Sequence, residues 1–348
     1  MGPQIRGSQP VYIIRLISSS QYRRVFKLSR RHFLGASLAT TVYAAGSLVP
    51  VWAQNAPNLG TPALPNPGFR RTKVGDAEVI ALLDGIARRP LGEEFVKNAP
   101  LAEVRALLAS QGLPTDYIDV PFTPFLVMVG GRKILLDTGL GEFGGPTTGK
   151  LLENLRAAGV QPADIDTVLI SHYHGDHING LRNKAGEMVF PKAKIMVPAV
   201  EHAFWMDDAR MASAPAGMKG AFDNVRRTFA SLPAETLVPF AAGAEIAPGI
   251  QAVAAYGHTP GHTLFELTSA GQKFFYVADL TNVPALFARN PDWAVTFDMD
   301  AEAARKVRRE VFQRVTASNA MVGGFHFPFP AMGRMAASGA GYAFQPAS

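Results

Sequence analysis

The stretch SHYHGDHING (171–180) most constrains what this chain can fold into. Three histidines and one aspartate occupy six consecutive positions, although the whole chain has only eight histidines. His172 and His174 are two apart, so an extended backbone leaving a strand points both rings to the same side. The glycine that follows allows a sharp turn, which directs Asp176 and His177 toward a second position. A polar loop of hydrogen-bonded histidines is the alternative, but this density of donors favours metal ligands.

Further donors follow apolar runs elsewhere in the chain. YGHTPGHT supplies His258 and His262 in a turn constrained by proline and glycine. Asp279 ends the apolar run FFYVA, and His326 comes directly after NAMVGGF. A carboxylate at the end of a buried strand is costly unless a cation or several donors compensate it. We therefore expect Asp279 to lie between two metal ions.

The charge distribution argues against a nucleic-acid partner. The formal net charge is +6, with 34 basic and 28 acidic residues. Residues 1–53 hold seven of the basic residues and no acidic one, which leaves a nearly neutral body. Such a body attracts phosphate backbones only weakly. The chain has no cysteine, which excludes disulfides, thiolate ligands and a cysteine nucleophile.

The N-terminal residues 1–53 have the pattern of a twin-arginine signal peptide. Arg30 and Arg31 precede an uncharged stretch that ends at VWA, with small residues placed for a signal peptidase. An uncleaved membrane anchor is the alternative, since residues 33–53 are almost long enough to span a bilayer. The cleaved form predicts export by the twin-arginine machinery and a periplasmic location. Residues 54–68, rich in Pro, Asn and Gly, are expected to form a flexible linker.

Regular patterning fills residues 69–348 and occurs in two successive halves, each with strands followed by a helix. This repetition predicts one domain in which two sheets pack together with helices outside. Strands are expected at 77–85, in a hairpin over 125–139, at 166–171 and 193–198, three times within 249–280, and last at 319–325. Helices are expected at 148–160, 199–211 and 300–318.

The ordered set HxHxDH, GHTPGH, an aspartate after a strand and a histidine after a strand resembles the signature of the metallo-β-lactamase superfamily. The resemblance covers about residues 70–330, and LLDTG (135–139) matches a further segment of that family. It implies an α/β fold, a four-layer αβ/βα sandwich with the site at one edge. It also implies which residues bind metal. One ion would take His172, His174 and His258, a second would take Asp176, His177 and His326, and Asp279 would bridge them.

The remaining histidines are expected to be structural. In the family the first histidine of the GHTPGH turn is normally the ligand, so His262 is expected to hydrogen-bond within the turn. His202 lies on an expected helix, and a surface or core position is expected for it.

Within the superfamily the chain most resembles the methyl parathion hydrolase-like group, through its C-terminal run FHFPFPAMGRMAASGAGYAFQP and its leader. Asp279 argues against the cysteine-free lactamases, and Asn282 stands where acyl-homoserine lactonases usually carry tyrosine. In the methyl parathion hydrolase-like group, aromatic residues line the substrate pocket at positions that match Phe143, Trp205 and Phe222. Ordinary core packing is the alternative for these three.

The resemblance implies a binuclear metal-dependent hydrolase with two divalent ions, zinc being the expected metal. A hydroxide bridging the ions would attack a lactone, an aryl ester or a phosphotriester, while Asp176 and Asp279 fix the geometry and move the product proton. An acyl-homoserine lactonase or a β-lactamase-like hydrolase is the alternative within the superfamily. Alternatives of another class are a mono-iron dioxygenase and a non-catalytic periplasmic metal-binding protein. The expected partner is a small-molecule substrate, and homodimers are common in the group.

Overall fold

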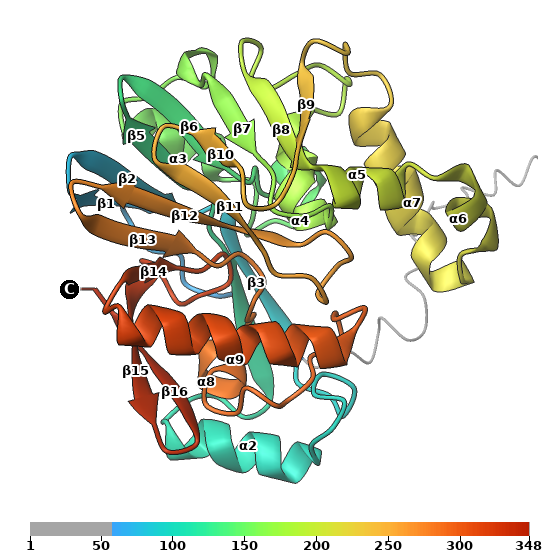
Figure 1. Cartoon of the computed structure of the whole chain (residues 1–348). Coiled ribbons are helices and arrows are strands. Elements are labelled where there is room, and N and C mark those ends of the chain that lie inside the picture. Colours follow the sequence, from blue (N-terminus) through green and yellow to red (C-terminus); the bar gives the residue numbers. More distant parts are fainter. Residues whose placement is uncertain (1–57, 348) are drawn as a thin grey trace, which may run out of the picture. The chain divides into compact units, whose positions relative to one another are not determined.

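A computed structural model describes residues 58–347 of the chain (Figure 1). The expected twin-arginine leader and the first part of the expected linker lie outside these residues. The rest of the linker, residues 58–68, forms neither helix nor strand. Within residues 58–347 no helix has both the length and the apolar character needed to cross a membrane.

Two seven-stranded sheets pack against each other (Figure 1). In the first, neighbouring strands follow the order β1-β2-β5-β6-β7-β8-β9. Pairing is antiparallel from β1 to β6 and parallel from β6 to β9. The strands are β1 (Phe69–Val74), β2 (Ala77–Leu82), β5 (Phe125–Val129), β6 (Arg132–Leu136), β7 (Thr167–Leu169), β8 (Lys194–Pro198) and β9 (Leu237–Phe240).

The second sheet runs in chain order from β10 to β16, and only β13 and β14 pair in parallel. Its strands are β10 (Glu245–Ala247), β11 (Ile250–Ala254), β12 (Thr263–Ser269), β13 (Gln272–Tyr276), β14 (Met321–Gly323), β15 (Met332–Ser338) and β16 (Gly341–Pro346). A separate antiparallel pair, β3 (Gly85–Pro90) and β4 (Tyr117–Phe122), completes the β structure of the described chain.

Helices cover the outer faces of the two sheets (Figure 1). Against the first sheet lie α3 (Leu151–Ala157), α4 (Gly175–Ile178), α5 (Ala199–Trp205) and α7 (Ala216–Phe229), with α6 (Asp208–Ser213) beyond them. Against the second sheet lies α9 (Ala301–Ala317), while α2 (Leu101–Ser110) and α8 (Pro284–Phe287) share a smaller apolar cluster. Short 3-10 turns are η1 (Gly141–Phe143), η2 (Pro162–Asp164) and η3 (Asn179–Leu181).

The buried stretches of the central strands of the first sheet are continuous apolar runs because each of their faces is covered. In β2, Val79 belongs to the core between the sheets, whereas its neighbour Ile80 belongs to the core under the helices. In β6, Ile134 and Leu135 divide in the same way. Successive side chains of a strand point to opposite faces, so a continuous apolar run fills two cores at once. Truncating Leu135 to alanine is expected to lower the free energy of unfolding by about 2–5 kcal/mol.

The expected layered α/β sandwich is confirmed, with some differences in its elements. The strand expected to be last, at 319–325, is followed by β15 and β16, which complete the second sheet. The single helix expected over 199–211 is two helices. The break occurs because the Asp207 side chain accepts a hydrogen bond from the backbone N–H of Arg210 and caps a new helix.

Candidate metal centre

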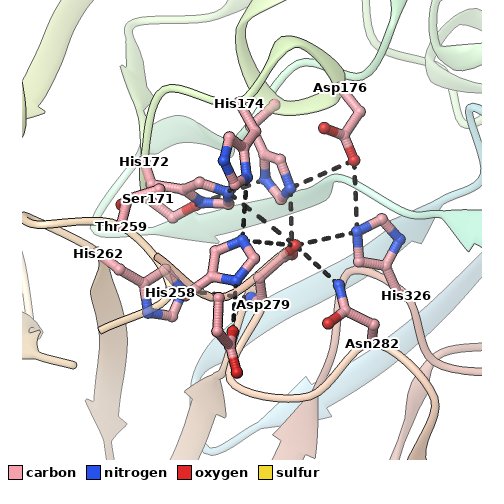
Figure 2. A network of polar contacts seen from close by, with 12 residues as sticks. Ser171, His172, His174, Asp176, His258, Thr259, His262, Asp279, Asn282 and His326 are labelled. Atoms are coloured by element: carbon pink, nitrogen blue, oxygen red, sulfur yellow. Dashed lines mark hydrogen bonds and ion pairs between the residues drawn. The ribbon is translucent and has the colours of Figure 1, made fainter. Parts of the chain in front are cut away.

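The predicted metal-binding residues all follow the carboxyl ends of strands, at one edge of the two sheets. His172 and His174 follow β7, His258 follows β11, Asp279 follows β13 and His326 follows β14. Because parallel strands end on the same side of a sheet, loops after β13 and β14 meet there, as do those after β6, β7 and β8. Residues far apart in the sequence therefore surround one point (Figure 2).

Four donors form what we term the first donor group, which consists of His172, His174, His258 and Asp279. One ligand atom from each lies within 4.8 Å of the others. His174 Nδ1 lies 3.1 Å from His172 Nε2 and 3.0 Å from His258 Nε2. Donors about 2.0–2.1 Å from one tetrahedral ion are themselves about 3.3 Å apart, so this spacing suits a single ion.

The second donor group consists of Asp176, His177 and His326. Asp176 Oδ2 lies 3.3 Å from His326 Nε2 and 3.6 Å from His177 Nε2. Asp279 also reaches this group, with Oδ1 3.1 Å from His177 Nε2 and Oδ2 3.2 Å from His326 Nε2. Since the same Oδ2 lies 3.2 Å from His258 Nε2, the Asp279 carboxylate lies between the two groups (Figure 2).

The orientation of the imidazole rings fits bound cations. His258 Nδ1 lies 2.9 Å from Asp298 Oδ1 and donates its hydrogen there, so its Nε2 directs a lone pair toward Asp279. His177 is held in the same way, because its Nδ1 lies 2.8 Å from Asp137 Oδ2. His177 Nε2 and Asp279 Oδ1 are buried and have no hydrogen-bond partner among the described residues. Facing lone pairs of this kind need a cation or a proton between them.

The electrostatics of the site also call for positive charge. Burial lowers the pKa of His258, but the carboxylates of Asp279 and Asp298 raise it to about 9. Burial likewise opposes the charged form of His326, while Asp279 and Asp176 raise its pKa to about 9. For His174, burial dominates and lowers the pKa to about 3, which leaves a neutral ring with a free lone pair. Metal ligation requires the neutral form of imidazole, so bound cations would replace the protons that the carboxylates favour on His258 and His326.

Asp137 supports both donor groups from the end of β6. Its carboxylate accepts hydrogen bonds from Ser171 N at 2.8 Å, from Ser171 Oγ at 2.7 Å and from Tyr276 Oη at 2.6 Å, in addition to His177 Nδ1. Ser171 Oγ in turn lies 3.0 Å from His172 Nδ1. Asp137 has φ 58°, a left-handed conformation that is strained for a non-glycine residue. This backbone conformation places the carboxylate beside the candidate ligands, where its hydrogen bonds fix ring orientation.

The groups that orient His258 and His326 from behind differ in charge. Asp298, which holds His258, accepts a hydrogen bond from the buried Arg308 guanidinium at 3.2 Å. His326 Nδ1 instead donates to the backbone oxygen of Pro121 at 2.7 Å. One ligand is therefore fixed by a charged network and the other by a neutral carbonyl.

A cavity of about 520 Å³ lies above the two donor groups. Four metal-ligand candidates form its floor, and the rest of its lining is largely apolar and aromatic. The lining residues are His174, Asp176, Asp279, His326, Asn282, Gly175, Ala87, Arg89, Phe95, Val120, Phe122, Leu140, Phe143, Gly144, Gly145, Thr147, Thr148 and Phe297. The arrangement can hold an apolar molecule with one polarised bond against the metal-binding residues.

Sequence comparison places the chain in a family. A model of the metallo-beta-lactamase superfamily matches residues 123–322, more than half of the chain. The chain belongs to the metallo-beta-lactamase superfamily. The matched segment contains six of the seven predicted metal ligands, and His326 follows shortly after it. No curated protein matches the sequence.

Two solved structures of this superfamily are similar over most of the chain. The dizinc quorum-quenching lactonase AidC, in complex with its product N-hexanoyl-L-homoserine, is 28% identical, with a TM-score of 0.74 over 81% of this chain and 98% of that one. The hydrolase AbOPH is 27% identical, with a TM-score of 0.75 and the same shares covered. A probable metal-dependent hydrolase from Staphylococcus aureus is 22% identical, with a TM-score of 0.65 over 80% of this chain and 100% of that one, and shares the fold.

The structure brings all seven predicted metal ligands together, in the two groups expected from the superfamily resemblance. His262 lies beside them and belongs to neither donor group, and its side chain bonds to residues outside the turn in which it was expected to bond. Its Nδ1 donates to the backbone oxygen of Ala255 at 2.9 Å, and its Nε2 accepts from the Asp279 backbone N–H at 3.2 Å. His202 is half-buried and bonds to the Tyr173 hydroxyl at 2.8 Å, away from both donor groups.

Of the three aromatic residues expected in the substrate pocket, one lines the cavity and two do not. Phe143 lines it, with the Arg227 guanidinium 4.0 Å from the centre of its ring. Trp205 and Phe222 are each 1% exposed and pack together in the core between the first sheet and its helices. For these two the expectation is corrected, because α5 and α7 turn both rings inward. The alternative of core packing applies to them.

Sequence reasoning missed the residues that support the ligands, above all Asp298 and Glu201. Asp137 carried a usable signal, since it is an acid directly after an apolar strand, as Asp279 is. Asp298 lies in FDMD, where nothing local separates it from surface acids. Glu201 occupies a short helix with mixed polarity, and only the tertiary structure shows that it is fully buried.

Proposed function

We propose that the protein is a binuclear metal-dependent hydrolase that takes two divalent ions, zinc being the expected metal. The observation that carries this proposal is the pair of donor groups that share Asp279 at the floor of the cavity. Nitrogen and carboxylate donors without sulfur suit Zn²⁺, and also Fe, Mn or Co. The dizinc nature of AidC supports the choice of zinc.

A pair of bound divalent ions supplies activated water at neutral pH and polarises a substrate oxygen. The protein's own residues provide the rest of the chemistry. Asp137, Asp298 and the Pro121 carbonyl hold the imidazole rings in one orientation, so little reorganisation is needed during reaction. Asp176, whose side chain is 22% exposed, faces the cavity and can accept a proton there. In hydrolysis the proton released by the attacking water would pass through this carboxylate to the leaving oxygen as the acyl C–O bond breaks.

The substrate that we propose is a lactone or an aryl ester with an apolar substituent. Phe95, Phe122, Phe143 and Phe297 line the cavity and suit a neutral acyl chain or ring. AidC, a lactonase solved with an acyl-homoserine product, supports the lactone. A phosphotriester presents the same combination of polarised oxygen and leaving group, so it belongs among the substrates to be tested, as in the methyl parathion hydrolase-like group.

The test combines metal analysis with a substrate panel. Purified protein is expected to contain two zinc-like ions per chain and to hydrolyse at least one of a set of lactones, aryl esters, paraoxon-type triesters and β-lactams. The Asp279→Ala variant is the control, and it should bind fewer than two ions and lose activity. One iron per chain together with oxygen consumption would identify a dioxygenase instead. Two ions without turnover of any substrate would contradict the hydrolase.

We further propose that residues 1–53 direct the folded enzyme to the periplasm through the twin-arginine pathway. The proposal rests on the pair Arg30 and Arg31 before an uncharged stretch. Replacing both with lysine should leave the protein in the cytoplasmic fraction, while the unchanged chain appears in the periplasm. Equal distribution of the two forms would reject the pathway.

A homodimer is also proposed, and the molar mass in solution tests it.

A further inference from the structure

Glu201 in α5 is a carboxylate that is completely buried, with 0% of its surface exposed, and its surroundings are unusual. Its Oε1 accepts hydrogen bonds from the Tyr173 backbone N–H at 2.9 Å and from Trp205 Nε1 at 2.8 Å. Its Oε2 accepts from Thr259 Oγ1 at 2.9 Å and from the Gly261 backbone N–H at 2.7 Å. Four donors thus satisfy a group whose burial would otherwise be strongly unfavourable.

These donors come from the two segments that carry the first donor group. Tyr173 lies between His172 and His174, so Oε1 fixes the backbone from which both rings project. Thr259 directly follows His258, so Oε2 fixes the other segment. The two segments are more than 80 residues apart in the chain, and they follow strands of different sheets. A single carboxylate therefore connects the two halves of one metal site.

The close approach of the two segments depends on Gly261. A Cβ atom at this position would lie 2.3 Å from the backbone nitrogen of Glu201, a distance that no side chain tolerates. Only glycine lets the turn after His258 come so near to α5. Trp205, which was expected to contact substrate, donates its indole hydrogen to Glu201 instead. Gly261 and Trp205 thus both support the contact of Glu201 with the two segments.

We propose that Glu201 is a positioning residue that sets the geometry of the first donor group, by holding the HYH segment against the HTPG turn. The inference rests on the metal site of the proposed function. It concerns the first ion position above all, because the Tyr173 N–H lies between two of its ligands, whereas Asp176 and His177 come after the turn at Gly175 and no hydrogen bond of Glu201 reaches a segment next to His326. Loss of the connection would let His174 and His258 separate, and the first ion would bind less tightly than the second.

The experiment measures zinc affinity at both positions in Glu201→Gln, with a competing chelator. Glutamine keeps the size of the side chain but turns an amide donor toward groups that are themselves donors. We expect the affinity for the ion held by His172, His174 and His258 to fall by about 10–100-fold, as is usual when outer contacts of a ligand are lost. The affinity for the other ion should change by less than about threefold. The kcat value should fall while KM stays nearly unchanged.

The matched control is Glu266→Gln. Glu266 is another buried carboxylate, 3% exposed, but its partners are Lys273 and Arg314 on the second sheet and α9. Its substitution reports the general effect of removing a buried charge, and both zinc affinities should stay close to those of the unchanged protein. A weaker test at the site itself is Thr259→Val, which removes one donor and keeps the shape. It should lower affinity for the first ion by a few fold, even if Glu201→Gln fails to fold.

Several results would overturn the inference. One is unchanged zinc affinity in both Glu201→Gln and Thr259→Val. Another is a loss at Glu201→Gln that is equal for the two ions and matched by Glu266→Gln, which would mean a purely structural role. Failure of the proposed function is a separate outcome, since it would appear as two tightly bound ions without hydrolysis in the unchanged protein. In that case the selective loss of the first ion in Glu201→Gln would still support the positioning role.

Discussion

The two donor groups of the site differ in what lies behind them. In the first group, His258 is held by Asp298, whose charge is balanced by the buried Arg308. In the second group, His326 is held by the neutral carbonyl of Pro121. A carboxylate partner orients a ring more strongly than a carbonyl and makes it a better ligand. His258 is therefore the more firmly oriented of these two ligands, while His177 of the second group has the Asp137 carboxylate behind it.

The groups differ in exposure as well. His172 and His258, in the first group, are 0% and 2% exposed, and neither lines the cavity. In the second group both Asp176 and His326 line it. His174 and Asp279 of the first group line the cavity too, and His177 of the second does not, so the difference is one of degree: a larger share of the second group faces the cavity. The second ion is therefore expected to exchange more readily than the first, although Asp279 serves both.

The largest effect should come from Asp279, because both groups depend on it. We expect Asp279→Ala to bind fewer than two ions and to lose at least about 10²–10³-fold in kcat/KM. Metal content and hydrolysis rates measured on the same preparation test this. Retention of both ions in Asp279→Ala would show that the carboxylate is not shared.

Single substitutions within each group should separate the two positions. We expect His258→Ala to bind the first ion so weakly that the second ion is no longer held either. His326→Ala is expected to lose only the second ion. Both should lower activity by about 10²-fold or more, since hydrolysis of this kind uses both ions. Brief dialysis of the unchanged protein against a chelator should remove the second ion first. Unchanged activity in His326→Ala would remove that residue from the site.

Substitution of the residues that hydrogen-bond the ligands should give smaller and more selective effects. Asp298→Asn is expected to lower affinity for the first ion by about 10–100-fold. It should also lower the free energy of unfolding by about 3–5 kcal/mol, because Arg308 loses its charged partner. Asp137→Asn should weaken the second ion more than the first, through His177. Chelator competition and denaturant titration measure the two quantities. An equal loss of affinity for both ions in both variants would argue against a difference between the two donor groups.

The smallest effect should come from the cavity wall. Phe143→Ala removes a ring that lines the cavity and stacks under Arg227, so we expect KM to rise by about 3–10-fold for an apolar lactone or aryl ester. Metal content and kcat should stay nearly constant, since Phe143 belongs to neither donor group. Phe222→Ala, a buried position in the helical core, is the comparison. It should lower stability and leave KM unchanged.

The fold and the ligands could be predicted because their signals are local. Apolar runs that end in histidine or aspartate mark strand ends, and the density of donors in HYHGDH marks a metal loop before any tertiary contact is known. The division of the ligands into two groups followed from the superfamily resemblance, and the structure places the seven side chains in those groups.

The supporting residues could not be predicted because their roles arise from distant contacts. Glu201 and Trp205 are four positions apart on one short helix, and their sequence does not show that the tryptophan serves the glutamate. A position matched to a family's pocket can also point into the core, as Trp205 and Phe222 do. The broken helix near Asp207 depended on one capping hydrogen bond, which periodicity alone does not indicate.

The metal ligands come from both sheets, and this has a consequence for how the chain folds. No half of the molecule contains a complete first donor group, because His174 follows a strand of one sheet and His258 a strand of the other. An ion can bind tightly only after the two sheets have docked, so its binding energy adds to the stability of the docked state alone. At an ion concentration about 100 times Kd this gain is about 2.7 kcal/mol for each position. Available metal would then stabilise, at a late stage of folding, only those chains whose two sheets have docked correctly.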